Sequence, residues 1–205
     1  MKLYKLILPL CIMAMALAMP GCKKFVESGN VNVNPNLPAD ATLNTLLPAV
    51  EFVTGNSQTS VAYITSMFTQ QMAAYSSGPF NDDQHRDVRI ASAFFGVYQN
   101  GMTNSKILID KAISLGSPHY TAIGRILFVT NMQLATDTYG DLPLTEAFQA
   151  PVILQPKYDK QQDIYTYMLQ ELDKAITEIA QVNPATLKPA VDDLIYAPTP
   201  FGLSI

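Results

Sequence analysis

The chain has 205 residues, of which 48% are hydrophobic, and its 13 basic and 17 acidic side chains give a formal net charge of −4 at pH 7. This composition excludes wholesale disorder and provides enough apolar residues for a domain with a sizeable core. The acidic balance argues against nucleic acid as a partner, because nucleic-acid binding depends on basic patches that neutralise phosphates.

The N-terminus has the pattern of a bacterial secretion signal. Lys2 and Lys5 precede an uncharged apolar run from Leu6 to Met19. As a helix this run is about 21 Å long, which is too short for the hydrocarbon core of a bilayer, about 30 Å thick. We therefore expect residues 1–21 to be a signal peptide and not a membrane anchor.

A cysteine follows this run in the sequence M-P-G-C at positions 19–22. The pattern resembles a lipobox, in which a small residue precedes a cysteine that is diacylated before cleavage. We predict that Cys22 is lipidated and that 22–41 form an extended tether, since this stretch is rich in Asn, Pro and small residues without helical periodicity. The alternative is an ordinary signal peptide cut elsewhere, which leaves Cys22 as a free thiol.

Two amphipathic helices are predicted next. Apolar residues recur at helical spacing over 42–58, and Gly55-Asn56 is predicted to close this first helix. A second stripe runs over 60–77 and ends at Gly78-Pro79. Apolar stripes of this kind form core far more often than they form ligand sites.

The loop at 78–89 is the most polar stretch of the chain, and it places an aromatic ring among charged and amide groups. Loops on a helical scaffold commonly carry binding sites. An aromatic ring can contact the C–H face of a sugar while polar side chains bind its hydroxyls. We take this loop as the candidate ligand site, the alternative being a solvated connection between helices. The candidate residues are Phe80, Asn81, Asp82, Asp83, His85 and Arg86.

Three further helices are predicted at 90–115, 119–139 and 160–181 from the spacing of their apolar residues. Arg125 is the only basic residue of the middle helix, which we therefore expect to be buried on several sides. The helices would pack as antiparallel hairpins that resemble tetratricopeptide repeats, so the predicted fold class is all-α.

Between the last two helices, residues 140–158 are predicted to cross the fold as ordered irregular backbone with one short turn at 145–148. Gly140 suits a helix stop at Tyr139, and prolines at 143, 151 and 156 exclude helix or central strand. Asp159, with Gln162 three residues later, has the pattern of a capping box for the last helix. The apolar residues expected to pack this crossing are Leu142, Leu144, Phe148, Val152, Ile153 and Leu154.

Three motifs in this part of the chain carry a family resemblance. They are D-x-Y-G-D-x-P-x-x-E-A-F from Asp137, P-x-Y-D-x-Q-x-x-I-Y from Pro156, and L-x-x-L-D-x-A-I from Leu169. In this order they resemble the SusD/RagB family of outer-membrane nutrient-binding lipoproteins. Each residue taken alone is explained by a cap, a turn or a core contact, so the motifs identify a family and not a site.

The resemblance implies a lipoprotein anchored in the outer membrane at the cell surface of a Gram-negative bacterium. It would capture a glycan or a peptide and deliver it to a TonB-dependent transporter of the SusC type. The resemblance also implies that 42–182 form the N-terminal helical domain of a longer protein and that 183–205 form an irregular, truncated tail. We therefore expect this chain to fold as helices but to bind nutrients poorly on its own.

Motifs for catalysis, cofactor binding or metal binding are not found. His85 and His119 are the two histidines, and neither they nor the cysteines have the local spacing of a metal site. Motifs for a catalytic serine, a phosphate loop or a dinucleotide are absent. We expect no enzymatic activity and no cofactor. A structural helical-repeat lipoprotein that docks a membrane partner is the main alternative function, and a hydrolase is a distant third.

We predict that mass spectrometry of protein from the membrane fraction finds Cys22 carrying lipid, because the apolar run ends there and no other cleavage site competes with it. An unmodified Cys22 in that fraction would contradict the prediction. Release of the wild-type protein in soluble form would contradict it as well.

Overall fold

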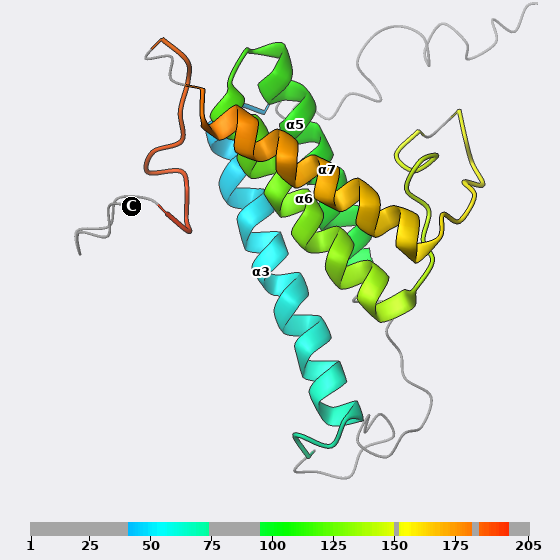
Figure 1. Cartoon of the computed structure of the whole chain (residues 1–205). Coiled ribbons are helices and arrows are strands. Elements are labelled where there is room, and N and C mark those ends of the chain that lie inside the picture. Colours follow the sequence, from blue (N-terminus) through cyan, green and yellow to red (C-terminus); the bar gives the residue numbers. More distant parts are fainter. Residues whose placement is uncertain (1–40, 74–94, 150–151, 182–184, 197–205) are drawn as a thin grey trace, which may run out of the picture. The chain divides into compact units, whose positions relative to one another are not determined.

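The computed structural model describes residues 41–73, 95–149, 152–181 and 185–196 (Figure 1). All of them except Ala41 belong to one compact unit, Thr42–Ile205. Within these ranges no strand is formed, which confirms the predicted all-α class. The elements are α3 (Leu43–Phe68), the π-helix η2 (Phe95–Met102), α5 (Thr103–Ser114), α6 (Pro118–Tyr139) and α7 (Gln161–Ile179).

Helix α3 is a single helix of 26 residues where two helices were predicted. The predicted stop at Gly55-Asn56 is wrong because the buried stripe continues through it in register. Gly55 is exposed on the helix, where a glycine costs only about 1 kcal/mol relative to alanine. The predicted end near Ser77 is also wrong, since α3 ends at Phe68. The buried stripe across the predicted stop is Leu47, Val50, Thr54, Ser57 and Val61.

Where the structure describes it, from Phe95 on, the helix predicted at 90–115 is a π-helix followed by an α-helix, η2 and α5. A close contact with α6 explains the glycine in η2: a Cβ on Gly101 would lie 2.5 Å from Oδ1 of Asn131. Asn131 is fully buried and donates a hydrogen bond of 2.8 Å to the hydroxyl of Thr54 on α3. Gly101 therefore allows three elements to meet around one buried amide.

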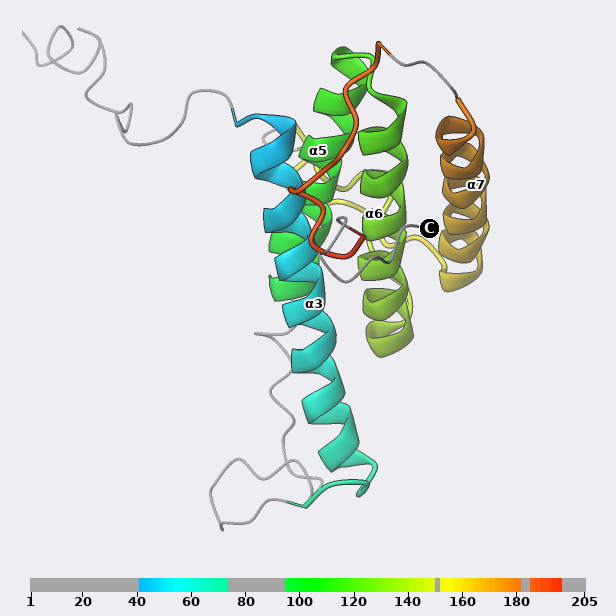
Figure 2. The ribbon, with the colours of Figure 1, turned by 90° about the vertical axis from the view of Figure 1, so that its left-hand side faces the viewer.

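Helix α6 is the centre of the packing. It lies between α7 on one side and α5, η2 and α3 on the other (Figures 1 and 2). Its predicted burial on several sides is confirmed, and the antiparallel hairpins that α6 forms with α5 and α7 resemble tetratricopeptide repeats as predicted. One core cluster includes Phe128 and Met132 of α6 with Ile164 and Met168 of α7.

An ion network joins α6 to α7. The Nε of Arg125 lies 3.0 Å from Glu178, and a guanidinium nitrogen also binds the carboxylate of Glu171. Lys174 binds Glu171 from the solvent side at 2.7 Å. The side chain of Glu171 is only 5% exposed, so its charge depends on these partners.

The outer face of α7 is apolar and is not covered by the described residues. Its exposed apolar side chains recur three, four or seven positions apart, which places them in one stripe. They are Tyr165, Leu169, Ile176 and Ile179, with exposed fractions between 38% and 67%.

We predict that Arg125→Ala lowers the free energy of unfolding by about 3 kcal/mol, because it leaves the buried carboxylate of Glu171 without its arginine partner. Burial acts to raise the pKa of Glu171, but Lys174 and Arg125 outweigh it and hold that pKa below its ordinary 4.5. The contribution of the network is therefore present above pH 4.5 and is lost as the pH falls through the lowered pKa.

Urea unfolding followed by circular dichroism measures this difference. Lys106→Ala is the matched control, since Lys106 pairs with Asp110 on the surface of α5 and its removal should cost less than about 1 kcal/mol. Equal losses for the two variants would contradict the prediction.

Candidate functional site

The crossing from α6 to α7 begins and ends at one antiparallel bridge. Helix α6 ends at Tyr139 as predicted, and Gly140 follows with a positive φ of 78° and a ψ of −127°, a conformation open to glycine but different from the left-handed one expected for the helix stop. The backbone N–H groups of Leu142 and Asp159 then donate to each other's carbonyls, at 3.2 and 2.9 Å. The bridge draws the two ends of the crossing together, and the turn expected at 145–148 is present.

Two aspartates bind across this bridge. The carboxylate of Asp159 accepts the N–H groups of Leu144 at 2.9 Å and of Thr145 at 2.7 Å, and it also accepts the Thr145 hydroxyl. Burial acts to raise the pKa of Asp159, but these hydrogen bonds outweigh it and lower the pKa. In the opposite direction, Asp141 accepts the N–H of Gln161 in the first turn of α7 at 2.9 Å.

The predicted capping box at Asp159 and Gln162 is therefore wrong. The N-cap of α7 is Lys160, which makes no side-chain capping bond. The Asp159 carboxylate binds backbone N–H groups of the turn rather than those of the helix, because the bridge places it beside Thr145. At the start of the helix, the N–H of Gln161 instead donates to the carboxylate of Asp141, twenty positions earlier.

Further motif residues hold the same region. Glu146 accepts the N–H of Lys157 at 3.0 Å, and the Gln161 side-chain amide donates to the carbonyl of Thr136 at 2.8 Å. We call the bonds of Asp141 with Gln161, Asp159 with Leu144 and Thr145, and Glu146 with Lys157 the clasp. The motifs thus have a structural role here, because their polar side chains bind the crossing to itself and to α7.

The clasp does not bury all of the crossing. Leu142 is 2% exposed, and Leu144 and Phe148 pack on the core. The expectation that Val152 and Leu154 pack as well is wrong, since they are 86% and 81% exposed. The turn and the bridge attach the two sides of this segment to the helices. Between them Val152 and Leu154 project into solvent, whereas Ile153 is half-buried.

Phe148 has a left-handed backbone, with φ of 60°. For a bulky residue this conformation costs on the order of 1–3 kcal/mol and is kept only where surrounding contacts enforce it. The ring stacks on Tyr98 with centroids 5.3 Å apart, and Phe128 meets its edge at 6.0 Å. The Tyr98 hydroxyl also donates to the carbonyl of Pro143 at 2.5 Å, so η2 supports the crossing.

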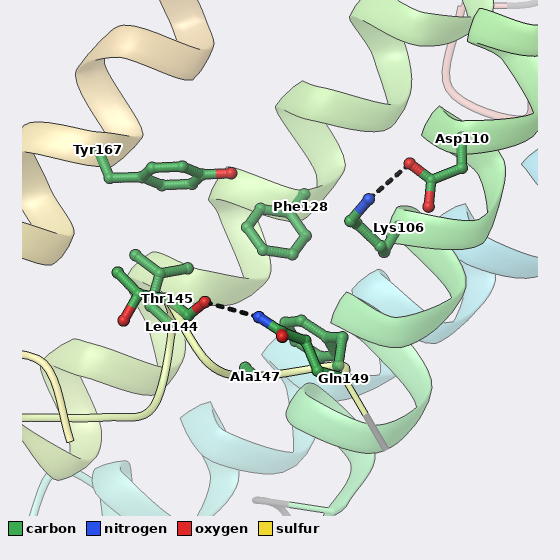
Figure 3. Close-up of a pocket in the computed structure, with 9 residues that line it drawn as sticks. Lys106, Asp110, Phe128, Leu144, Thr145, Ala147, Gln149 and Tyr167 are labelled. Carbon is green, nitrogen blue, oxygen red and sulfur yellow. Dashed lines mark hydrogen bonds and ion pairs between the residues drawn. The ribbon is translucent and has the colours of Figure 1, made fainter. Parts of the chain in front are cut away.

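A pocket of about 420 Å³ opens where this turn meets α5, α6 and α7 (Figure 3). Its aromatic lining includes Phe128 and Tyr167, whose ring centroids lie 6.4 Å apart. Figure 3 shows Tyr167 on one side of Phe128 and the Lys106–Asp110 pair on the other. The remaining lining residues are Leu144, Thr145, Ala147, Phe148 and Gln149.

The polar groups of the pocket can bind hydroxyl groups. Lys106 lies 2.5 Å from Asp110, and both side chains are about half exposed, so either can take a further partner. The Gln149 amide donates to the carbonyl of Thr145 at 3.0 Å, which leaves its oxygen as an acceptor. Burial, and then the charge of Glu171, raise the pKa of Tyr167, so its hydroxyl stays protonated at neutral pH.

A second hollow, of about 480 Å³, lies between α3 and α6. Val61, Ile64, Phe68 and Leu134 line it with few polar groups, so it is less suited to a polar ligand. In the part of the chain that the structure describes, no cluster of His, Cys, Asp or Glu could hold a metal ion. No described helix is long and apolar enough to cross a membrane.

The site residues predicted from the sequence lie outside the described ranges. These are Cys22 and the loop residues Phe80, Asn81, Asp82, Asp83, His85 and Arg86. Conversely, Lys106, Asp110 and Gln149 were missed by the sequence analysis. An i,i+4 ion pair on a helix indicates a solvated face, and only the position of the 145–149 turn brings that pair to a pocket.

Two of the comparisons with known proteins find similar proteins. Residues 35–199 match the model of a SusD-like family described as starch-binding and associating with the outer membrane. A SusD/RagB family protein from Bacteroides thetaiotaomicron has a similar structure, with a TM-score of 0.62 and 21% identity over 71% of this chain and 32% of that one. At this identity the likeness shows a shared fold.

A SusD homolog from the same organism aligns with a TM-score of 0.45 and 18% identity, covering 68% of this chain and 29% of that one. This chain thus spans about a third of the length of the solved structures that it matches. A comparison with curated protein sequences gives no match.

We predict that Asp159→Ala lowers the free energy of unfolding by about 2 kcal/mol, because three donors of the turn lose a charged acceptor. Hydrogen exchange should show faster exchange at the Leu144 and Thr145 amides. Asp173→Ala, at an exposed position of α7, is the control and should change stability by less than about 0.5 kcal/mol. Unchanged exchange at Leu144 and Thr145 would contradict the prediction.

Proposed function

Because this chain belongs to the SusD-like family, described as starch-binding and associating with the outer membrane, we propose that it is a cell-surface nutrient-binding lipoprotein. It captures a glycan, or a peptide, and delivers it to a TonB-dependent outer-membrane transporter of the SusC type. The observation that carries the proposal is the family match over residues 35–199, which is supported by the helical fold.

The proposal places the protein on the outer membrane through lipid on Cys22. The signal peptide at 1–21 directs export, and the tether at 22–41 separates the helical domain from the lipid surface. These assignments rest on the pattern of charged, apolar and small residues at the N-terminus.

The pocket at the 145–149 turn supports a glycan as the ligand. It combines aromatic rings with a cation, a carboxylate and an amide, which are the groups that bind the C–H faces and hydroxyls of a sugar. The loop at 78–89, with Phe80 and Asp83, is proposed as a second region of contact. The described part offers few converging polar groups, so we expect weak binding by this chain.

Binding without catalysis is the proposed activity. Among the described residues that line the pocket, Asp110 is the one carboxylate, and it is paired with Lys106. Glycoside hydrolysis generally requires two carboxyl groups about 5–9.5 Å apart across the sugar.

A docking lipoprotein without a ligand site is the second candidate, and the exposed apolar stripe of α7 favours it. Leu169 is 63% and Ile176 is 67% exposed, and stripes of this kind commonly contact another protein surface. The two candidates differ in whether a sugar binds at the pocket.

We predict that a starch oligosaccharide, titrated into the full chain and followed by NMR, shifts the resonances of Tyr167 and Gln149 with a dissociation constant in the millimolar range. Gln149→Ala and Lys106→Ala should each weaken binding about fivefold, the effect of one hydrogen bond of about 1 kcal/mol. Asp173→Ala, at an exposed position of α7 outside the pocket lining, is the control and should leave the affinity unchanged.

Absence of binding by every oligosaccharide and peptide tried would favour the docking candidate. Tight binding that survives Gln149→Ala but is abolished by Phe80→Ala or Asp83→Ala would move the site to the loop at 78–89.

A further inference from the structure

The segment after α7 returns to the helices and binds them through polar groups. Residues 185–196 contact the start of α6 and the first half of α3, and Figure 2 shows the segment in front of the helices. The Ser117 hydroxyl donates to the carbonyl of Leu187 at 2.6 Å, and the Tyr120 hydroxyl donates to Asp192 at 2.5 Å. Leu194 donates its backbone N–H to Glu51 of α3 at 2.7 Å. We call residues 185–196 the return segment.

The contact between the return segment and α3 contains two buried carboxyl groups. Glu51 is 5% exposed and Asp193 is 7% exposed. Asp193 accepts the N–H groups of Ile195 at 3.0 Å and Tyr196 at 2.7 Å. Glu51 uses Oε2 for the N–H of Leu194, while its buried Oε1 has no partner among the described residues.

Leu194, the residue next to Asp193, donates its N–H to Glu51, so the two buried carboxyl groups belong to the same contact. Two ionised carboxylates both accept and cannot form a hydrogen bond, whereas one carboxyl proton between them supplies the missing donor. A shared proton would therefore satisfy the orphaned oxygen of Glu51 and remove the repulsion between two buried charges.

The surrounding charges favour that proton. Burial is the main cause that raises the pKa of Glu51 to about 7; Asp193 and Asp192 raise it further, and the bond from Leu194 opposes them. Asp192 is itself bound to Tyr120 and to the N–H of Ala190. No lysine or arginine in the described part of the chain is among the groups that shift Glu51.

We propose that Glu51 carries a proton that it donates to Asp193, and that this proton holds the end of the return segment, residues 190–196, on α3. Attachment of the segment is then controlled by pH.

The direction of the pH dependence follows from the two states of Glu51. In the attached state its pKa is about 7, and in the released state it returns toward its ordinary 4.5. Attachment is strongest below pH 4.5, weakens by up to tenfold per pH unit between 4.5 and 7, and levels off above pH 7. Burial lowers the pKa of His119 beside Lys188, which gives a weaker dependence of opposite sign.

The test is hydrogen exchange of the full chain between pH 5 and 8, expressed as protection factors for residues 190–196 so that the intrinsic pH dependence is removed. The wild type should lose protection by about tenfold per pH unit up to pH 7 and then level off. Glu51→Gln keeps an acceptor for Leu194 and adds a permanent donor, so its protection should not fall over this range. His119 is present in both proteins, so their difference isolates Glu51.

Asp193→Asn is the second variant, used if Glu51→Gln fails to give the wild-type circular dichroism spectrum. Its amide keeps the acceptor for Ile195 and Tyr196 and donates to Glu51, so it should reduce the pH dependence. Asp173→Asn, at an exposed position of α7, should show the same pH dependence of protection as the wild type. Protection of the wild type that is constant with pH would overturn the proposal. A pH dependence that persists in Glu51→Gln would overturn it too. Protection that a metal chelator removes would also overturn it, because a cation and not a proton would then link the two carboxylates.

Discussion

The structure of the α6–α7 hairpin depends on the hydrogen bonds that Asp141 and Asp159 make to the backbone across the Leu142–Asp159 bridge. Each carboxylate binds N–H groups on the opposite side of the crossing: Asp141 binds the first turn of α7, and Asp159 binds the turn at 144–145. The N–H of Leu144 is partly buried, and an N–H group removed from water without an acceptor costs about 1–3 kcal/mol. With three prolines in the crossing, regular helix or sheet cannot provide them.

These hydrogen bonds also set the geometry of the candidate site. Asp159 holds Thr145, and the turn that starts there carries Phe148 in its left-handed conformation against Tyr98 and Phe128. Gln149 then reaches the pocket opposite the Lys106–Asp110 pair (Figure 3). The family motifs therefore act on the pocket mainly through the backbone that they fix, while several residues that line it lie outside those motifs.

The all-α fold, the stop at Tyr139 and the turn at 145–148 could be predicted because local causes decide them: helical periodicity, a glycine and prolines. The continuity of α3 could not, because a stop signal at Gly55 was weaker than the tertiary burial of the stripe around it. The role of Asp159 was missed for a related reason. Its local pattern is that of a helix cap, but its carboxylate accepts the N–H of Leu144, fifteen residues earlier. The pocket requires residues from α5, α6, α7 and the crossing, and nothing local indicates that they meet.

The central claim is that Asp141 and Asp159 act as one unit, and a double-mutant cycle measured by urea unfolding tests it most directly. The free energies of unfolding of Asp141→Ala, Asp159→Ala and the double variant are compared with that of the wild type. If either substitution alone already loosens the bridge, the second one has less stability left to remove. The double variant should then lose at least about 1 kcal/mol less free energy of unfolding than the two single variants lose together. Losses that add to within about 0.3 kcal/mol would show two independent hydrogen-bonding sites and would contradict the account.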